Sequence, residues 1–170
     1  MEFSKTAELK ADSLFLKVGG FLNEGADFGK YDFGKINSLN IDFSKFELIN
    51  SRGIMIWIRW FHEARFSNKN LKIFFANCPK PLIDQFNLIS SLLPKSTKVL
   101  SFFVPMICPQ CSNTANVVLT EGKDFILNRS AAKYEVVVPM AVCSKCGSTM
   151  KSEAMPQKYF QFLKSCVGEE

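Results

Sequence analysis

Four of the six cysteines stand in two CxxC pairs, Cys108 with Cys111 and Cys143 with Cys146. Two intervening residues let both sulfur atoms of one turn reach the same ion, and Zn²⁺ prefers four soft ligands in a tetrahedron. A single CxxC pair would also suit a thioredoxin-like redox role. Two pairs, each next to a run typical of a strand, favour a metal. The sequence therefore predicts that these four thiolates hold one structural Zn²⁺.

A site of this kind is chemically closed. Four protein ligands leave no position for a substrate or a catalytic water, which argues against a hydrolytic metal centre. His62, the only histidine, lies in an aromatic-rich segment far along the chain from the CxxC pairs, and we expect it to be a packed or surface residue. No histidine, carboxylate and nucleophile form a recognisable motif. We therefore expect a protein that is not an enzyme.

The two remaining cysteines, Cys78 and Cys166, have apolar or small neighbours. Free cysteines usually behave as small buried hydrophobic residues, and we expect the same here. The N-terminal stretch contains no apolar segment of the secretory type, and no window reaches the roughly 18 apolar residues that a membrane span needs. We expect a cytoplasmic protein with reduced thiols.

The part of the chain before the CxxC pairs alternates between strand and helix patterns. Apolar and aromatic runs predict strands at 13–22, 36–49, 71–78 and 97–107. Apolar residues at three- and four-residue spacing predict a helix of about 13 residues from Ile54, and Pro79 and Pro81 open a second helix that ends at Pro94. This order indicates an α/β layer with a mostly parallel sheet. The almost uninterrupted apolar run 71–78 is typical of an interior strand covered on both faces.

The segment that contains the CxxC pairs, residues 105–148, resembles zinc ribbons. Its two strand-like runs are too short to bury a core of their own, so the metal would have to stabilise them. Residues 156–166 follow, with proline at the start and apolar residues at helical spacing, which predicts a C-terminal helix.

A short polar segment, Asn50-Ser51-Arg52-Gly53, separates the strand at 36–49 from the helix after it. Ser51 falls where an N-cap residue is expected, with its hydroxyl accepting a hydrogen bond from a free backbone N–H. The same position suits a second role, because a phosphate at a helix N-terminus meets unpaired N–H groups and the positive end of the dipole.

The segment "SLNIDFSKFELINSRGIMIWIRW" (38–60) resembles the centre of STAS domains of the bacterial anti-sigma factor antagonist type. In this comparison Asn50 stands where the family usually has aspartate, Ser51 on the phosphoacceptor serine, Arg52 on a small hydroxyl residue and Gly53 on the glycine. The segment "LKIFFANCPKPLIDQFNLISSLLP" (71–94) is similar to the strand and helix that follow. The resemblance implies signalling by protein–protein interaction. It makes the polar segment 50–53 the partner-binding surface and Ser51 the phosphosite.

Together these patterns predict an α/β fold: a STAS-like mixed sheet with helices over residues 1–105, and a small β zinc ribbon with a C-terminal helix over residues 106–170. The resemblance implies a protein partner such as an anti-sigma factor or a related kinase. The alternative is a nucleic-acid-associated protein that uses the ribbon.

Charge argues against that alternative. The formal net charge is +5, with 14 Lys/Arg and 10 Asp/Glu in residues 1–103 and 7 against 6 in residues 104–170. Four thiolates with one Zn²⁺ would bring the ribbon to about −1. A ribbon of that charge is a poor phosphate clamp, so nucleic acid is not the expected ligand.

Overall fold

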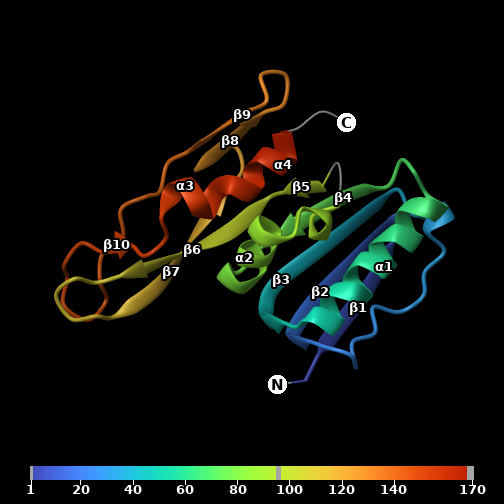
Figure 1. The fold of residues 1–170 in the computed structure, drawn as a ribbon, viewed down its shortest axis with the longest axis horizontal. Helices are drawn as coiled ribbons and strands as arrows, with labels where there is room; N and C mark the ends of the chain where they lie inside the picture. The colour runs from blue at the N-terminus through green and yellow to red at the C-terminus, as the bar shows by residue number, and fades with distance from the viewer. Residues whose placement is uncertain (1, 95–96, 168–170) are drawn as a thin grey trace.

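The structure is a computed structural model that describes residues 2–94 and 97–167. Its strands are β1 Ser4–Lys10, β2 Ser13–Leu22, β3 Ser38–Ile49, β4 Lys72–Ala76, β5 Thr97–Val99, β6 Ser101–Ile107, β7 Thr114–Thr120, β8 Phe125–Asn128, β9 Lys133–Val136 and β10 Lys151–Ser152. Its helices are α1 Ser51–Ser67, α2 Lys80–Leu88, α3 Pro156–Tyr159 and α4 Leu163–Val167, with the 3₁₀ turns η1 Phe33–Lys35, η2 Ser90–Leu92 and η3 Phe160–Phe162. The predicted α/β class, with a mixed sheet, helices and a C-terminal helix, is confirmed (Figure 1).

The first sheet has the strand order β1-β2-β3-β4-β5. β2 to β5 run parallel, as predicted, and β1 pairs antiparallel with β2. Sequence reasoning missed β1 because almost all of its residues are exposed, so it carries no apolar alternation. The segment between β2 and β3 contains only the short turn η1 in place of a crossover helix.

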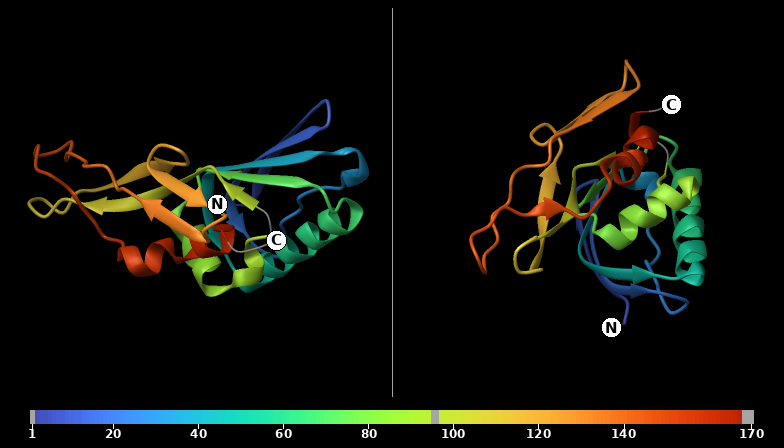
Figure 2. Two further views of the ribbon diagram at one scale, coloured as in Figure 1. Left: turned by 90° about the horizontal axis from the view of Figure 1, so that it is seen from above. Right: turned by 60° about the vertical axis from the view of Figure 1, so that its left-hand side comes forward.

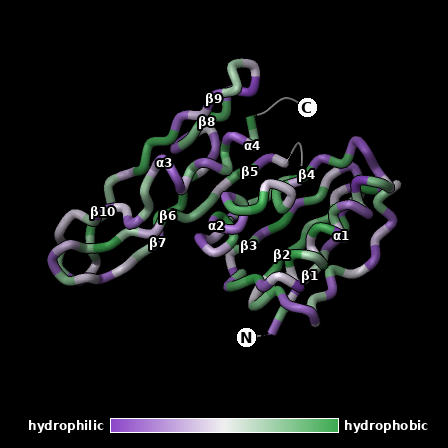
Figure 3. Tube along the Cα trace, in the orientation of Figure 1, coloured by the Kyte–Doolittle hydropathy of each residue, from purple (hydrophilic) through white to green (hydrophobic). Residues whose placement is uncertain are grey.

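Helices α1 and α2 cover one face of the first sheet and leave the other face open (Figure 2). Hydrophobic residues recur along β2, β3 and α1 (Figure 3). The prediction that segment 71–78 is covered on both faces is wrong. Ile73 and Phe75 of β4 are buried under the helices, whereas Phe74, between them, lies on the open face and is only partly buried. Successive side chains of a strand point to opposite faces, so a continuous apolar run does not prove that both faces are covered.

Trp57 of α1 is the centre of the core under the first sheet. Its ring lies 4.8 Å from the ring of Phe61 and 5.7 Å from that of Phe75, measured between centroids. Its indole N–H donates to the backbone oxygen of Leu92, 2.8 Å away. Trp57 is fully buried, and this bond gives its one polar group a partner.

The predicted single strand 97–107 is two strands, β5 and β6, in two different sheets. Leu100 separates them, and its N–H donates to the oxygen of Phe75. Beyond that point Cys78 still exchanges backbone hydrogen bonds with Ser101 and Phe103. Because β4 has already ended at Ala76, β6 finds its neighbours elsewhere and forms the second sheet, in the order β10-β6-β7.

The C-terminal helical segment folds back onto α2 and β6. The Tyr159 hydroxyl donates to the oxygen of Phe103 at 2.6 Å, and the rings of Phe86 and Phe162 lie 6.3 Å apart. One hydrophobic cluster therefore contains residues from both sides of the predicted boundary at 105/106. That boundary stays a prediction, and residues 1, 95–96 and 168–170 of the two predicted domains lie outside the described residues.

The described helices include none that is long and apolar enough to cross a membrane.

Candidate metal centre and the start of helix α1

The two CxxC turns meet at the end of the molecule farthest from α1 (Figure 1). The ligand atoms of Cys108, Cys111, Cys143 and Cys146 all lie within 4.8 Å of one another. The structure thus brings together four sulfur atoms from two segments that are far apart in the sequence. Cys108 and Cys143 are buried, whereas Cys111 and Cys146 reach the surface.

The two turns have the same backbone pattern. The N–H of Ser112 donates to the oxygen of Cys108, and the N–H of Gly147 donates to that of Cys143, each at 2.9 Å. Ser112 and Gly147 both have a left-handed backbone, with φ of 55° and 74°. Each first cysteine also donates its own N–H to a carbonyl five residues later. Two local turns of one shape therefore present their sulfur atoms to a common point.

The spacing of the sulfur atoms fits a tetrahedral ion better than a disulfide. Sγ of Cys108 lies 3.4 Å from Sγ of Cys146, and Sγ of Cys111 lies 3.5 Å from Sγ of Cys143. Zn–S bonds of about 2.3 Å in a tetrahedron place sulfur atoms about 3.8 Å apart, whereas a disulfide needs about 2 Å. The cluster could hold a metal ion, and four thiolates are the donor set that a structural Zn²⁺ takes.

Neighbouring donors favour the thiolate form in the second turn. Hydrogen bonds from the Ser148 hydroxyl and its backbone N–H lower the pKa of the Cys146 thiol to about 6. The pKa of Cys143 is lowered as well, mainly by the backbone N–H of Lys145. The Asn113 amide also reaches the Cys143 sulfur at 3.7 Å. Such groups orient metal-bound thiolates and support their charge.

The first turn differs in this respect. The backbone N–H of Asn113 lowers the pKa of the Cys111 thiol, but hydrogen bonds with the neighbouring sulfur atoms raise it to about 12. A metal ion would remove this competition, because all four sulfur atoms can be thiolates around a cation.

Cys78 and Cys166 are buried, as predicted, and neither belongs to the cluster. Burial raises the pKa of the Cys78 thiol well above its usual value, and burial is also the main reason that the pKa of Cys166 rises to about 12. Protonated, buried thiols of this kind are unreactive. His62 is exposed on α1, in agreement with its expected surface role.

The N-cap of α1 is Asn50, so the prediction that Ser51 caps the helix is wrong by one residue. The Asn50 side-chain oxygen accepts from the N–H of Gly53 at 2.8 Å. Ser51 is the first residue of the helix and is exposed. The extended backbone of Asn50 (φ −103°, ψ 176°) is the conformation that N-cap residues adopt, and asparagine is one of the best caps.

Gly53 is required by packing. A Cβ at this position would lie 2.0 Å from the backbone oxygen of Leu22, so α1 can approach β2 only with glycine here. The Asn50 amide also contacts the carboxylate of Glu24 at 3.3 Å. The pKa of Glu24 is lowered by its own backbone N–H first, then by Asn50, with a smaller effect of Arg52. One negative charge therefore already lies beside the start of α1.

Two exposed apolar side chains lie near this helix start. Met55, one turn after Ser51, is 71% exposed, and Leu48, near the end of β3, is 56% exposed. We call Leu48, Ser51, Arg52 and Met55 the α1-start surface. Of these four residues, Ser51 and Arg52 were predicted from the sequence to belong to a partner-binding surface. The exposure of Leu48 and Met55 could not be predicted from the sequence, because single apolar residues on strands and helices are expected to be buried.

A search among known protein families, curated proteins and solved structures found no match to this chain.

Proposed function

We propose that this protein is a non-enzymatic regulatory binding module of the STAS type, which docks a protein partner at the α1-start surface. The zinc ribbon in this proposal is a structural element that holds the far end of the second sheet. Ser51 is the switch: a kinase would transfer a phosphoryl group from a nucleoside triphosphate to its hydroxyl.

The observation that carries the proposal is the exposed set at the start of α1. A hydroxyl, a guanidinium and two apolar side chains are exposed there, all between residues 48 and 55 of the chain. Apolar side chains with a polar rim are the composition of a protein-docking surface. The parallel strands β2 to β5, with α1 directly after β3, also agree with the arrangement that the STAS resemblance implies.

Phosphate on Ser51 would change the electrostatics of this surface. It would add a charge of about −1.5 to −2 next to the first free N–H groups of α1 and to Arg52. Glu24 would repel it, but its carboxylate is exposed and screened by solvent. The fold should therefore tolerate the modification, whereas a partner that covers the surface would have to desolvate the new charge.

The test is capture of partners from a lysate of the source organism on immobilised, full-length protein. The unaltered chain should capture a protein that both Ser51→Asp and Met55→Asp lose. Met140→Asp is the matched control, because Met140 is 90% exposed but lies in the ribbon half, away from α1. Ser51→Ala should keep the partner.

If Ser51→Asp and Met55→Asp capture the same proteins as the unaltered chain, the start of α1 is a capped helix and not a docking surface. Melting curves of all variants are needed with the capture, since a general loss of fold would also lose the partner. Because both side chains are exposed, their substitutions should change stability by no more than about 0.5 kcal/mol.

A further inference from the structure

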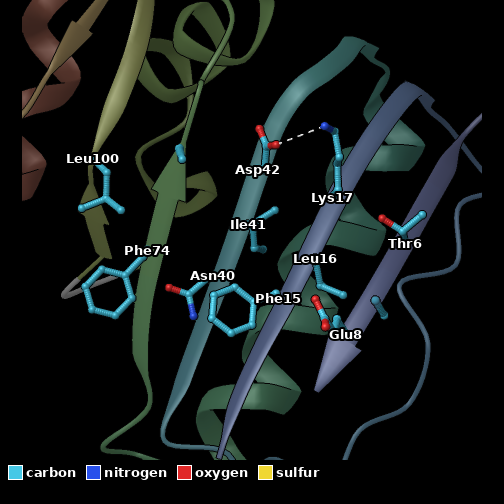
Figure 4. A pocket seen from close by; sticks show the side chains of 12 residues that line it. Thr6, Glu8, Phe15, Leu16, Lys17, Asn40, Ile41, Asp42, Phe74 and Leu100 are labelled. Carbon is cyan, nitrogen blue, oxygen red and sulfur yellow. Dashed lines mark ion pairs between the residues drawn. The ribbon is translucent and has the colours of Figure 1, made fainter. Parts of the chain in front are cut away.

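One row of side chains crosses the open face of the first sheet from β2 to β5, and Glu8 of the edge strand β1 stands in register with its first member, Phe15. Strand pairing places Phe15 of β2 beside Asn40 of β3, Asn40 beside Phe74 of β4, and Phe74 beside Lys98 of β5. Residues in register share one face of a sheet. Figure 4 shows the two rings and the amide between them on the face away from α1 and α2.

Both rings are accessible to a ligand. Phe15 is 41% exposed and Phe74 partly so, and both line a depression of about 500 Å³. Neighbouring strands lie about 4.8 Å apart, so rings on β2 and β4 are about 10 Å apart, with Asn40 between them. Lys10 Nζ lies 5.7 Å from the centroid of the Phe15 ring, so a base that stacks on this side of the ring would have to displace the ammonium group.

Two acidic residues of this face each have a cationic partner. Glu8 pairs with Lys10 at 3.1 Å, and Asp42 pairs with Lys17 at 3.5 Å. Asp42 also accepts from the Asn77 amide. These pairs leave the row itself free of uncompensated negative charge.

A basic depression of about 640 Å³ adjoins the row and shares Phe74 with it. It is lined by five cationic side chains and, in the described part of the chain, by no carboxylate: Arg65, Lys69, Lys72, Lys98 and Arg129. Arg65 is fixed there by donating to the oxygen of Leu71 at 2.7 Å. The cations come from the end of α1 and the turn that follows it, from β4 and β5, and from the turn after β8, so only the folded chain brings them together.

We propose that the open face of the first sheet binds single-stranded nucleic acid. Two bases would stack on Phe15 and Phe74, the Asn40 amide would hydrogen-bond to a base edge, and the cations beside Phe74 would hold the phosphates. Aromatic rings next to a basic groove are the combination that binds single strands with little sequence preference. A duplex would not fit, because its bases are already stacked and paired.

This function goes beyond the docking of a protein at the α1-start surface, and it uses a different face of the sheet. It also revises the expectation that nucleic acid is not a ligand. That expectation rested on the net charge of the ribbon, from which the proposed site takes only Arg129. The excess of positive charge lies in residues 1–103, and part of it gathers at this face.

Fluorescence anisotropy with labelled oligouridylate and oligothymidylate of about 12 nucleotides tests the proposal on the full-length, zinc-loaded protein. We expect micromolar binding at moderate salt. A slope of log Kd against log salt of about 2 is expected if three phosphates are neutralised, at about 0.7 for each. A difference between the two oligomers would report contacts to the 2′-hydroxyl.

Conservative variants distinguish a loss of base stacking from a loss of the fold. Phe74→Leu and Phe15→Leu keep apolar bulk but lose the ring, and each should weaken binding about tenfold. Phe74→Tyr should bind as the unaltered chain does. Lys72→Gln with Lys98→Gln should lower the salt slope by about 1.4.

Two controls show whether these losses belong to the face. Leu88→Ala removes an exposed side chain of α2, in the helix layer, and Lys151→Gln with Lys158→Gln removes two exposed charges of the ribbon half. Both controls should leave binding unchanged. The proposal is overturned if neither oligomer binds at low salt, if the leucine variants bind as well as the unaltered chain, or if polyglutamate competes as effectively as the oligonucleotides. The last two results would indicate attraction of charge alone.

Discussion

The four-cysteine cluster, with a metal bound, and the core under the first sheet would be stabilised in opposite ways. At the metal centre, four sulfur atoms come from two short turns, and two of the four cysteines are exposed. Under the first sheet, Trp57 packs among phenylalanine rings contributed by strands and helices from distant parts of the chain. A bound metal would make the first region depend on a few strong bonds, whereas the second depends on many weak contacts.

The comparison shows how the ribbon can be folded without a core of its own. Its strand β6 and the helical segment with Phe160 and Phe162 share the hydrophobic cluster of the first sheet. Cys108 and Cys143 also belong to this cluster, whereas the second cysteine of each turn, Cys111 or Cys146, is exposed. We therefore expect metal loss to affect those turns, and core damage to affect the whole molecule.

The largest effect is expected from removing a metal ligand. Protein never exposed to chelator should carry about one Zn²⁺ per chain, and Cys143→Ser should release it. Structural zinc contributes on the order of 10 kcal/mol in small zinc domains, so residues 108–113 and 141–150 should lose their order. Elemental analysis measures the metal, and hydrogen exchange locates the loss.

Cys166→Ala is the matched control, since Cys166 is a buried thiol outside the cluster, and this variant should keep its zinc. Loss of exchange protection in β2, β3 and β4 after Cys143→Ser would show that the two regions are not separate in stability. Zinc far below one equivalent in the unaltered chain would contradict the metal site itself.

The next largest effect is expected from a substitution in the core under the first sheet, Trp57→Ala. Removing a fully buried aromatic side chain costs about 3–5 kcal/mol, and the backbone oxygen of Leu92 would lose its partner. Denaturant unfolding should give one transition at lower midpoint for far-UV circular dichroism and for hydrogen exchange of residues 156–167 alike. Two separate transitions would indicate that the helical segment with Tyr159 does not share the core's stability.

A smaller effect distinguishes two neighbouring residues at the start of α1. Asn50→Ala removes the side-chain oxygen that caps the helix and should cost about 1 kcal/mol. Ser51→Ala should change the free energy of unfolding by less than about 0.5 kcal/mol, because its side chain is exposed and is not the cap. Chemical denaturation of both variants measures this, and equal losses would contradict the assignment of the cap.

The smallest effect concerns pH. The pKa of Cys166 is raised to about 12 in the folded chain, mainly by burial, from an ordinary value of 9.0. A raised pKa gives stability that is complete below the unfolded value and is lost as pH rises from there toward the folded value. Between pH 8 and about pH 10, the unaltered chain should therefore lose about 1 kcal/mol more than Cys166→Ala. Denaturation at the two pH values tests it, and parallel losses would contradict this role of the thiol.

The sequence by itself determined the features that depend on neighbours along the chain. CxxC spacing places two sulfur atoms on one turn whatever surrounds it, so the four candidate ligands were predicted, and the structure brings them together. Apolar periodicity located β2 and β3, and it placed the start of α1 to within three residues. The second helix was predicted to end at Pro94, but α2 ends at Leu88 and a separate 3₁₀ turn, η2, follows it. The helix cap was predicted one residue too late, because asparagine and serine are nearly equal as caps.

Only the tertiary structure decided which face of a strand is covered and where a strand changes sheets. The run at β4 reads as apolar throughout, but the helices cover Phe75 and leave Phe74 open. The residues from 97 to 107 read as one strand, but the end of β4 divides them at Leu100. Phe15, Asn40 and Phe74 lie on three strands and form a row only through pairing register. Such relations depend on contacts between residues that are distant in sequence, and a local pattern does not contain them.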